Sequence, residues 1–240
     1  MMNVAIIPAR GGSRRIPDKN IRPFAGRPMI SYAVAAAKAS AIFDSIIVTT
    51  DSEKIAAIAR EYGAEVPFMR PRELSDDRTP TAPVIVHALK WLRDQGRPME
   101  YACCIYPTAP FVRPEFIKKG HEILMERGVS SAFSVTTFPF PIFRALKINQ
   151  KGNIEMFWPE HELTRHQDLP QAYHDAGQFY WLRVASFLKN EKLYSSDAMP
   201  VLLPRYLVQD IDTPEDWGTA ERMYKALQSE EPARFDAEDR

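Results

Sequence analysis

Short apolar runs alternate along the first half of the chain with longer segments that favour helices. Runs that lack polar alternation are typical of strands buried on both faces of a sheet. Such runs cover residues 4–7, 45–50, 101–106 and 132–136, with a shorter candidate at 65–69. Helices are predicted over residues 29–40, 53–62, 81–94 and 114–127. The alternation predicts an α/β fold whose mostly parallel sheet carries helices on both faces.

The loops that follow these strands are where a ligand is expected. In an open α/β sheet, ligands bind beyond the carboxyl ends of the strands. The predicted strands therefore direct attention to residues 8–23, 50–53, 69–81 and 107–113. In the second of these loops, Asp51 and Ser52 are interpreted as a strand end and a helix cap, with a ligand contact as the alternative.

The alternation breaks after Thr137. Prolines interrupt the apolar segment 138–143, which suits neither a central strand nor a helix. Residues 138–175 are therefore predicted to form an insertion, in which 149–153 make a turn between two short extended segments. The aromatic content of the insertion favours burial against a second subunit, which would make the protein a homodimer. A flap over its own domain is the alternative.

Beyond the insertion, the pattern predicts two more strands and a last helix. The strands cover residues 178–182 and 206–210, and the helix covers 214–227. Residues 1–228 would then be one domain with its insertion. The acidic segment 229–240, which contains a proline, is predicted to be a disordered tail.

Composition and charge narrow the class of protein. The 240 residues include 31 Lys and Arg and 31 Asp and Glu, so the formal net charge is zero. A neutral chain lacks the basic field of a nucleic-acid-binding protein. No apolar run approaches the roughly eighteen residues of a membrane span, and the N-terminus lacks the charged region of a signal peptide. We therefore expect a cytoplasmic protein that binds neither nucleic acid nor membrane, with the adjacent Cys103 and Cys104 in its core.

The first loop concentrates positive charge within this neutral chain. Residues 10–22 hold the five cations Arg10, Arg14, Arg15, Lys19 and Arg22 against one acid, Asp18. The paired glycines at 11–12 allow the backbone to approach a ligand, and arginine offers planar donors for phosphate oxygens. The spacing fits neither a Walker A loop nor the glycine fingerprint of dinucleotide-binding proteins. The loop therefore predicts a phosphate site of another kind, with a solvated basic loop as the alternative.

A pair of carboxylates near the end of the chain suggests a metal site. Asp210 and Asp212 end an apolar segment, and residues two apart on a strand face the same side. Two carboxylates on one side suit Mg²⁺, which also takes substrate phosphates as ligands. The following residues, Thr213 to Asp216, are typical of the capped start of a helix. A polar turn without a metal is the alternative for the pair.

Several motifs, in order along the chain, resemble those of the CMP-sialic acid synthetases, also called acylneuraminate cytidylyltransferases. The opening motif is IPARGGS followed by IPDKN, at residues 7–13 and 16–20. Later motifs are RPRELS at 70–75, YPTAP at 106–110 and DID at 210–212. The resemblance extends over roughly residues 3–227. Within the family, segments 165–170 and 173–181 look most like those of the members that act on pseudaminic acid.

This resemblance implies a fold and an activity. The family fold is a Rossmann-like, mostly parallel sheet of the nucleotide-diphospho-sugar transferase type, with a small dimerisation insertion. The family reaction joins CTP to a nine-carbon keto-acid sugar and gives the CMP-sugar and pyrophosphate. CTP is thus expected as co-substrate and Mg²⁺ as cofactor. Pathways that use pseudaminic acid commonly serve the decoration of flagellin or other surface glycans.

The resemblance also implies roles for particular residues. Arg10, Lys19 and Asp212 are expected to take part in catalysis, and Asp210 and Asp212 match the family's metal pair. The residues expected around CTP are Ala9, Arg10, Gly11, Arg14, Asn20, Arg70 and Thr81. Those expected around the sugar are Tyr106, Thr108, Arg165, Gln167, Asp175 and Gln178, with Arg165 as the donor to the sugar carboxylate.

Two departures from the family pattern leave the sugar open. Arg14 and Arg15 stand where the sialic acid enzymes usually carry Lys-Gly, and Tyr106 stands where they usually carry Gln. The second change lies at the sugar end of the site. Sialic acid, legionaminic acid and the eight-carbon sugar of lipopolysaccharide (Kdo) are therefore alternatives to pseudaminic acid. A nucleotide-binding dimer without turnover is the alternative from another class.

Overall fold

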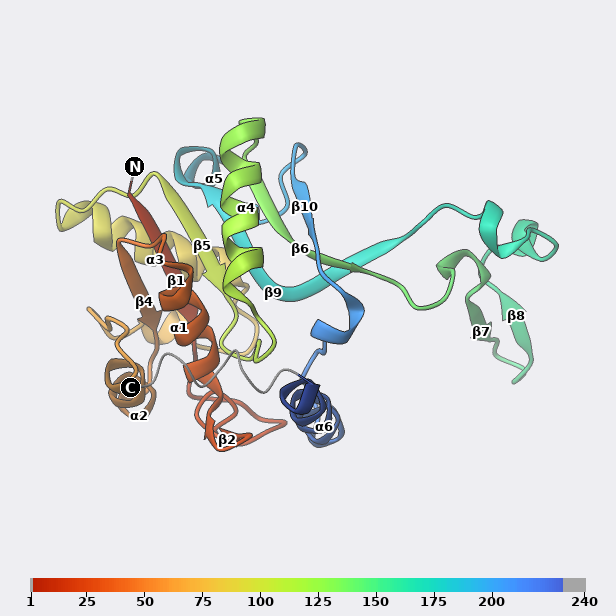
Figure 1. Ribbon diagram of the computed structural model, residues 1–240, viewed down its shortest axis with the longest axis horizontal. Helices are drawn as coiled ribbons and strands as arrows, with labels where there is room; N and C mark the ends of the chain where they lie inside the picture. Colours follow the sequence, from red (N-terminus) through yellow and green to blue (C-terminus); the bar gives the residue numbers. More distant parts are fainter. Residues whose placement is uncertain (1, 231–240) are drawn as a thin grey trace.

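A six-stranded sheet with the strand order β10-β6-β9-β5-β1-β4 forms the centre of the protein (Figure 1). The computed structural model describes residues 2–230. The sheet strands are β1 (Asn3–Pro8), β4 (Ser45–Thr49), β5 (Tyr101–Ile105), β6 (Ser131–Thr137), β9 (Tyr173–Arg183) and β10 (Met199–Leu202). The helices are α1 (Met29–Ser40), α2 (Glu53–Glu61), α3 (Thr81–Asp94), α4 (Pro114–Arg127), α5 (Val184–Asn190) and α6 (Pro214–Glu230). A small ribbon, β2 (Pro23–Phe24) with β3 (Arg27–Pro28), lies just before α1.

The first half of the chain confirms the predicted alternation of strands and helices. β1 pairs in parallel with β4 on one side and β5 on the other. Its residues alternate between two apolar clusters. Ala5 and Ile7 pack with α1, α2 and α4, whereas Val4 and Ile6 pack with α3 and α5. Each fully buried aliphatic side chain contributes about 1.5–3 kcal/mol, so these short runs specify strands that are covered on both faces.

One strand of the sheet is reversed. β9 runs antiparallel to both of its neighbours, β5 and β6. It is longer than the predicted strand 178–182 because its first residues pair with the end of β6. The chain leaves the sheet at the end of β6 and returns along it, and strands joined in this way are antiparallel. The sheet is therefore mostly parallel, as predicted.

Gly120 shows how closely α4 lies on the sheet. A Cβ atom at this position would lie 2.6 Å from Cδ1 of Trp181. Trp181 is fully buried on β9, and its indole N–H donates to the carbonyl of Ile117 at 2.9 Å. The absence of a side chain thus lets the helix backbone approach the bulkiest ring of the core.

The strand predicted at residues 206–210 is wrong. Arg205–Leu207 form a 3₁₀ helix, and the edge of the sheet is β10 instead. The apolar run is misleading because Tyr206 is 54% exposed, whereas Leu207 is buried against Trp217 outside the sheet. Helix α5 was not predicted either. The candidate strand at 65–69 is limited to two isolated bridges to β4 and the residue after it.

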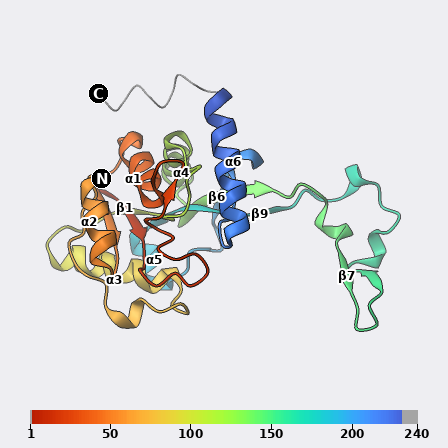
Figure 2. The same cartoon turned by 90° about the horizontal axis from the view of Figure 1, so that it is seen from below.

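Residues 138–172 project from the sheet as an arm (Figures 1 and 2). The arm carries a hairpin of β7 (Leu146–Ile148) and β8 (Ile154–Met156), joined by the turn predicted at 149–153. Asn149 Oδ1 accepts the backbone N–H groups of Lys151 and Asn153, both at 3.0 Å. In both views the arm points away from the sheet, so the alternative of a flap over its own domain is wrong.

The last described helix, α6, continues three residues beyond its predicted end. Of the predicted tail 229–240, only residues 229 and 230 are described, and they belong to this helix. The other residues of that prediction lie outside the described part of the chain. Among residues 2–230, no helix combines the length and apolar character needed to cross a membrane.

Candidate active site

A cavity of about 580 Å³ opens beyond the carboxyl ends of β1 and β5. Three of the four loops that the strand order singled out contribute to its lining, namely 8–23, 69–81 and 107–113. The predicted site residues that line the cavity are Arg10, Arg14, Lys19, Asn20, Arg70, Thr81, Tyr106, Thr108 and Asp212. Residues far apart in the sequence thus meet beyond the carboxyl ends of the strands, where ligands bind in open α/β sheets.

The charge of the lining is mostly positive. Five cations, Arg10, Arg14, Arg15, Lys19 and Arg70, share the cavity with two carboxylates, Asp77 and Asp212. Cations gathered in a concave surface attract a polyanion and raise its local concentration. Arginine and lysine donors also suit the oxygens of phosphate groups. The cavity is therefore suited to a ligand that carries several negative charges.

The basic loop folds back on itself at this cavity. Asn20 is 7% exposed, and its side-chain amide donates to the carbonyl of Arg10 at 2.9 Å. This bond closes the loop and holds its two ends together. Asp18 takes a positive φ of 52°, which reverses the chain before Lys19. The fold of the loop thus aims Arg10 and Lys19 at one space.

Two residues expected near CTP, Ala9 and Gly11, are not part of the cavity lining. Ala9 is fully buried, and its N–H donates to the carbonyl of Thr49 at 3.0 Å. The N–H of Gly11 donates to Asp51 Oδ1 at 2.7 Å, so it is not directed at a ligand. A Cβ atom on Gly11 would lie 3.0 Å from the Cβ of Ser52, and the glycine therefore serves close packing. The expected cap is present, because Ser52 Oγ accepts the N–H of Ile55 at 3.5 Å.

Arg70 brings a buried charge to the cavity. The residue is 6% exposed, and its guanidinium donates to the hydroxyl and the carbonyl of Thr49. Burial lowers the pKa of Arg70 to about 10, so the side chain keeps its proton at neutral pH. A cation held this firmly against the end of β4 provides a fixed donor for a ligand.

Tyr106 and Thr81 belong to the uncharged part of the lining. The Thr81 hydroxyl, in the first turn of α3, lies 3.2 Å from the Tyr106 hydroxyl. Burial raises the pKa of Tyr106, so its hydroxyl is neutral at physiological pH and can donate a hydrogen bond. The ring of Tyr106 packs on Tyr180, with centroids 5.3 Å apart. This part of the cavity is suited to hydroxyl and amide groups.

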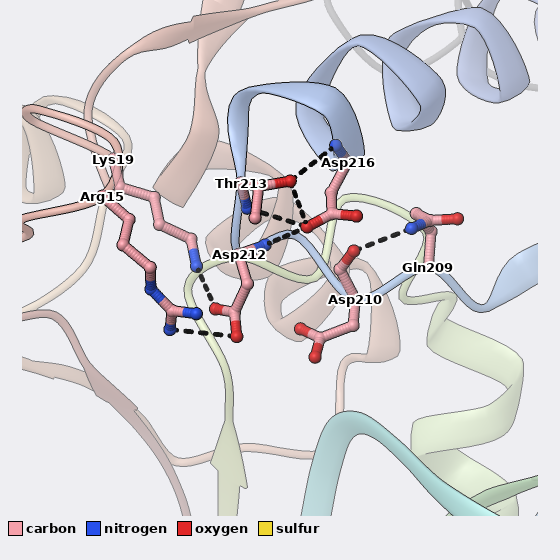
Figure 3. A network of polar contacts seen from close by, with 7 residues as sticks. All are labelled: Arg15, Lys19, Gln209, Asp210, Asp212, Thr213 and Asp216. Carbon is pink, nitrogen blue, oxygen red and sulfur yellow. Dashed lines mark hydrogen bonds and ion pairs between the residues drawn. The ribbon is translucent and has the colours of Figure 1, made fainter. Parts of the chain in front are cut away.

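The carboxylate pair lies at the start of α6, beside the basic loop (Figure 3). Asp212 forms ion pairs with Arg15 at 3.0 Å and Lys19 at 3.2 Å. Figure 3 shows the carboxylates of Asp210 and Asp212 on the same side of the chain. The residues are not on a strand. They share a side because Ile211, between them, is 1% exposed and packs inward in an extended segment.

Asp216 has the structural role expected of it. Its Oδ2 accepts the N–H of Thr213 at 2.7 Å and that of Asp212 at 3.0 Å, while its own N–H donates to the Thr213 hydroxyl at 3.2 Å. The hydrogen bond from the Thr213 hydroxyl lowers the pKa of Asp216. These bonds form a capping box, which begins α6 and fixes the backbone of Asp212.

A small apolar cluster joins the basic loop to the carboxylate pair. Ile16 and Phe24 from the first loop pack with Ile211 and Trp217 from the end of the chain. The Arg22 guanidinium lies over the Trp217 ring, 5.0 Å from its centroid. Because Ile211 stands between the two carboxylates, this cluster sets the distance between the cations and the acids.

The donors present are compatible with a divalent cation. Two carboxylates on one side suit Mg²⁺, which is usually held by one or two carboxylates, water and substrate phosphates. Within residues 2–230, no group of three or more His, Cys, Asp or Glu side chains could enclose a metal ion. A cation at Asp210 and Asp212 would therefore need ligand oxygens to complete its coordination.

Four residues expected at the sugar lie outside the cavity lining. Arg165 and Gln167 are on the arm, where Arg165 pairs with Asp168 at 2.7 Å. Gln178 is 4% exposed, and its amide donates to the carbonyl of Leu207. Asp175 Oδ2 accepts the hydroxyls of Tyr180, at 2.6 Å, and Tyr194. Gln178 and Asp175 thus have structural partners, because they lie on β9 between packed elements.

Two charged residues of the lining, Arg15 and Asp77, were missed as site residues. Arg15 was counted among the cations of the loop, and its charge was signal enough to include it. Asp77 carries no such signal, because it lies in an exposed turn where an acid is ordinary. Its Oδ2 lies 3.1 Å from Arg14 Nη1, so it joins the loop 69–81 to the basic loop.

Comparison with known proteins identifies a family model and several relatives that match this chain. Residues 4–225 match the family model described as Cytidylyltransferase. A pseudaminic acid cytidylyltransferase of Campylobacter jejuni is 40% identical over 225 residues, which cover 94% of this chain and 97% of that protein. A CMP-N,N'-diacetyllegionaminic acid synthase of Legionella pneumophila is 32% identical, over 95% of this chain and 98% of that protein.

A solved structure shares the fold. A CMP:2-keto-3-deoxy-manno-octonic acid synthetase complexed with CTP aligns with a TM-score of 0.68 at 16% identity. The alignment covers 96% of this chain and 100% of that chain. The likeness confirms the predicted fold class, a nucleotidyltransferase-type α/β sheet.

Proposed function

The chain belongs to the cytidylyltransferase family, and from this membership we propose that it joins CTP to pseudaminic acid and releases pyrophosphate. The observation that carries the proposal is the cavity beyond β1 and β5, where five cations lie beside a carboxylate pair. The Campylobacter jejuni relative, at 40% identity over nearly the whole chain, supports pseudaminic acid as the sugar.

The cations are proposed to bind the triphosphate. Arg10 and Lys19 lie on the closed basic loop, where both can reach the oxygens of the leaving pyrophosphate. They would offset the charge that builds up on this group as the bond to the α-phosphorus breaks. Asn20, Arg70 and Thr81 are proposed to border the cytidine, and Arg14 to add a further phosphate contact.

Asp210 and Asp212 are proposed to hold Mg²⁺ together with phosphate oxygens. When bound, this ion supplies Lewis-acid polarisation of the phosphoryl oxygens. The chain's own contribution is to hold both carboxylates at a fixed place through Ile211 and the capping box of α6.

Tyr106 and Thr108 are proposed to bind the sugar in the uncharged part of the cavity. The sugar hydroxyl attacks the α-phosphorus, the bond to pyrophosphate breaks, and the hydroxyl proton leaves to solvent or base. Positioning the two substrates in line supplies much of the rate. Sialic acid, legionaminic acid and Kdo are alternatives at this end, since Tyr106 and Thr108 are the only two of the six described residues expected around the sugar that line the cavity.

The arm is proposed to pair with the arm of a second copy, which gives a homodimer. Its large apolar side chains are unusually exposed: Phe140 at 78%, Leu146 at 58%, Ile148 at 76%, Ile154 at 70% and Leu163 at 94%. A projecting apolar surface of this kind is typical of a protein interface. Pairing would also carry Arg165 and Gln167 toward the other subunit, where they could meet its sugar. Because CTP is the co-substrate, we propose that the enzyme works in the cytoplasm.

The test is pyrophosphate release from the purified protein with Mg²⁺. CTP, ATP, GTP and UTP are each combined with pseudaminic, sialic and legionaminic acid and with Kdo. Release with CTP and pseudaminic acid alone is the expected result. Release with CTP and another sugar would keep the chemistry and correct the substrate. If CTP binds and no well releases pyrophosphate, the protein is a nucleotide-binding dimer instead.

A further inference from the structure

Both oxygens of the Asp212 carboxylate are paired with cations of the basic loop (Figure 3). Lys19 Nζ lies 3.2 Å from Oδ1, and Arg15 Nη2 lies 3.0 Å from Oδ2. Asp210 differs, because its carboxylate makes no ion pair with any residue of the described chain. The carboxylate of Asp212, which lies against the cations of the basic loop, is thus neutralised before any ligand is bound.

The two cations are held differently. The Lys19 side chain is 16% exposed, whereas that of Arg15 is 66% exposed. An exposed ion pair adds little stability, so Arg15 can leave Asp212 at little cost. Asp212 itself stays in place when Arg15 leaves, because its N–H is bonded to Asp216 and its neighbour Ile211 is buried.

We propose that Arg15 is the counter-ion of Asp212 in the free protein and exchanges this carboxylate for the triphosphate when the nucleotide enters. The exchange frees Oδ2 of Asp212 for the divalent cation. The inference rests on the proposed function, since it takes Asp210 and Asp212 as the metal pair. It follows that the protein binds the cation poorly on its own and well together with the nucleotide.

Competition for one oxygen is the physical basis. An arginine at Oδ2 weakens the attraction of Asp212 for a divalent cation, because the two positive charges repel each other and compete for the same carboxylate. The triphosphate resolves the conflict, since it offers Arg15 several anionic oxygens inside the same cavity. Arg15 therefore determines when a divalent cation can bind to Asp212, and it does so without contacting the reacting atoms.

Arg14 provides the matched control. It is the adjacent residue, it lines the same cavity, and it is also an exposed arginine in an ion pair. Its partner, however, is Asp77, at 3.1 Å, and not a member of the carboxylate pair. Arg14→Gln and Arg15→Gln change the net charge equally, so any difference between them reports the local pairing.

The experiment is a titration of the free protein with Mn²⁺, followed by electron paramagnetic resonance, without nucleotide or sugar. Arg15→Gln is expected to bind Mn²⁺ about three- to fivefold more tightly than the parent, the change typical of removing an exposed ion pair. Arg14→Gln is expected to match the parent. Adding Asp212→Asn to Arg15→Gln is expected to remove the gain.

Each other result overturns the inference. These results are an Arg15→Gln variant that matches the parent, an equal gain in both arginine variants, and a gain that survives Asp212→Asn. Binding below detection in both the parent and Arg15→Gln counts against it as well. Failure of the proposed function is seen elsewhere, as absent pyrophosphate release, because the Mn²⁺ titration uses no substrate.

Discussion

The candidate site has a nucleotide end and a sugar end. The two ends differ in how many of their expected residues line the cavity of one chain. At the nucleotide end, Arg10, Lys19 and Asn20 are fixed by a closed loop on the end of β1. At the sugar end, Tyr106 and Thr108 line the cavity, but Arg165 and Gln167 lie out on the arm. The proposed nucleotide contacts therefore rest on the rigid sheet, and two of the proposed sugar contacts lie on the arm that is proposed to meet a second copy.

The largest effect is expected at the nucleotide end. Asp212→Asn should lower turnover at least a hundredfold and leave the fold intact, because a metal ligand and its charge are lost at a partly exposed position. Pyrophosphate release and a thermal melt measure the two effects. Asp216→Ala, which removes the cap but keeps the Asp212 carboxylate, is the comparison: it should cost about 1 kcal/mol of stability and lower turnover much less than Asp212→Asn does. Equal turnover in Asp212→Asn and the parent would remove the metal role.

The second prediction tests whether the sugar end of the site depends on a second copy of the chain. Ile148→Asp should raise the dimer dissociation constant about a hundredfold, because a side chain that the proposed dimer would bury is replaced by a charge. Sedimentation at several protein concentrations measures it. Lys151→Glu, a charge change in the exposed turn of the same hairpin, should leave the dimer intact. A parent protein that sediments as a monomer would contradict the proposed role of the arm.

A third prediction concerns the scaffold beneath both ends. Gly120→Ala should lower the free energy of unfolding by about 1–3 kcal/mol, because its methyl group would overlap Trp181 in a filled core. Chemical denaturation measures the change. Gly218 on α6 is the matched helical glycine, since a Cβ there meets only the flexible end of Arg222 at 3.4 Å. Gly218→Ala should be neutral or slightly stabilising. Equal losses in both variants would contradict the packing argument.

The smallest expected effect concerns the sugar end of the site within one chain. The Tyr194 hydroxyl donates to Asp175, which also holds Tyr180, the ring on which Tyr106 packs. Tyr194→Phe should raise KM for the sugar about three- to fivefold and leave kcat and KM for CTP unchanged, since one hydrogen bond contributes about 1 kcal/mol. Tyr173→Phe, at an exposed tyrosine of the same sheet, is the control. A rise in KM for both substrates would indicate general damage instead.

The sequence predicts the first half of the fold well because its signals are local. Unbroken apolar runs and glycine stops mark strands and helices almost to the residue, and topology then indicates which loops meet. The pair Asp210 and Asp212 was expected on one side because of a strand. The structure has no strand there, yet both carboxylates lie on one side of the chain, because Ile211 between them is buried on the other side.

The sugar residues could not be placed from the sequence for two physical reasons. Gln178 and Asp175 carry polar groups that satisfy the interior, and nothing in the sequence separates a polar side chain bonded inside from one that faces a ligand. Arg165 and Gln167 lie on an arm that projects from the sheet, and the sequence pattern does not give its direction. The strand predicted at 206–210 fails for a related reason, because Leu207 is buried against α6 and not within a sheet.

The apolar cluster of Ile16, Phe24, Ile211 and Trp217 has a consequence for synthesis. Proteins are made from the N-terminus, at about 5–20 residues per second, so the basic loop emerges long before the residues that anchor it. A chain that stops before residue 210 carries Arg10, Arg14, Arg15, Lys19 and Arg70 but lacks Asp210, Asp212 and Trp217. The site therefore forms only when the last helix has been made, and an unfinished chain has the charge to attract a nucleotide without the means to use it.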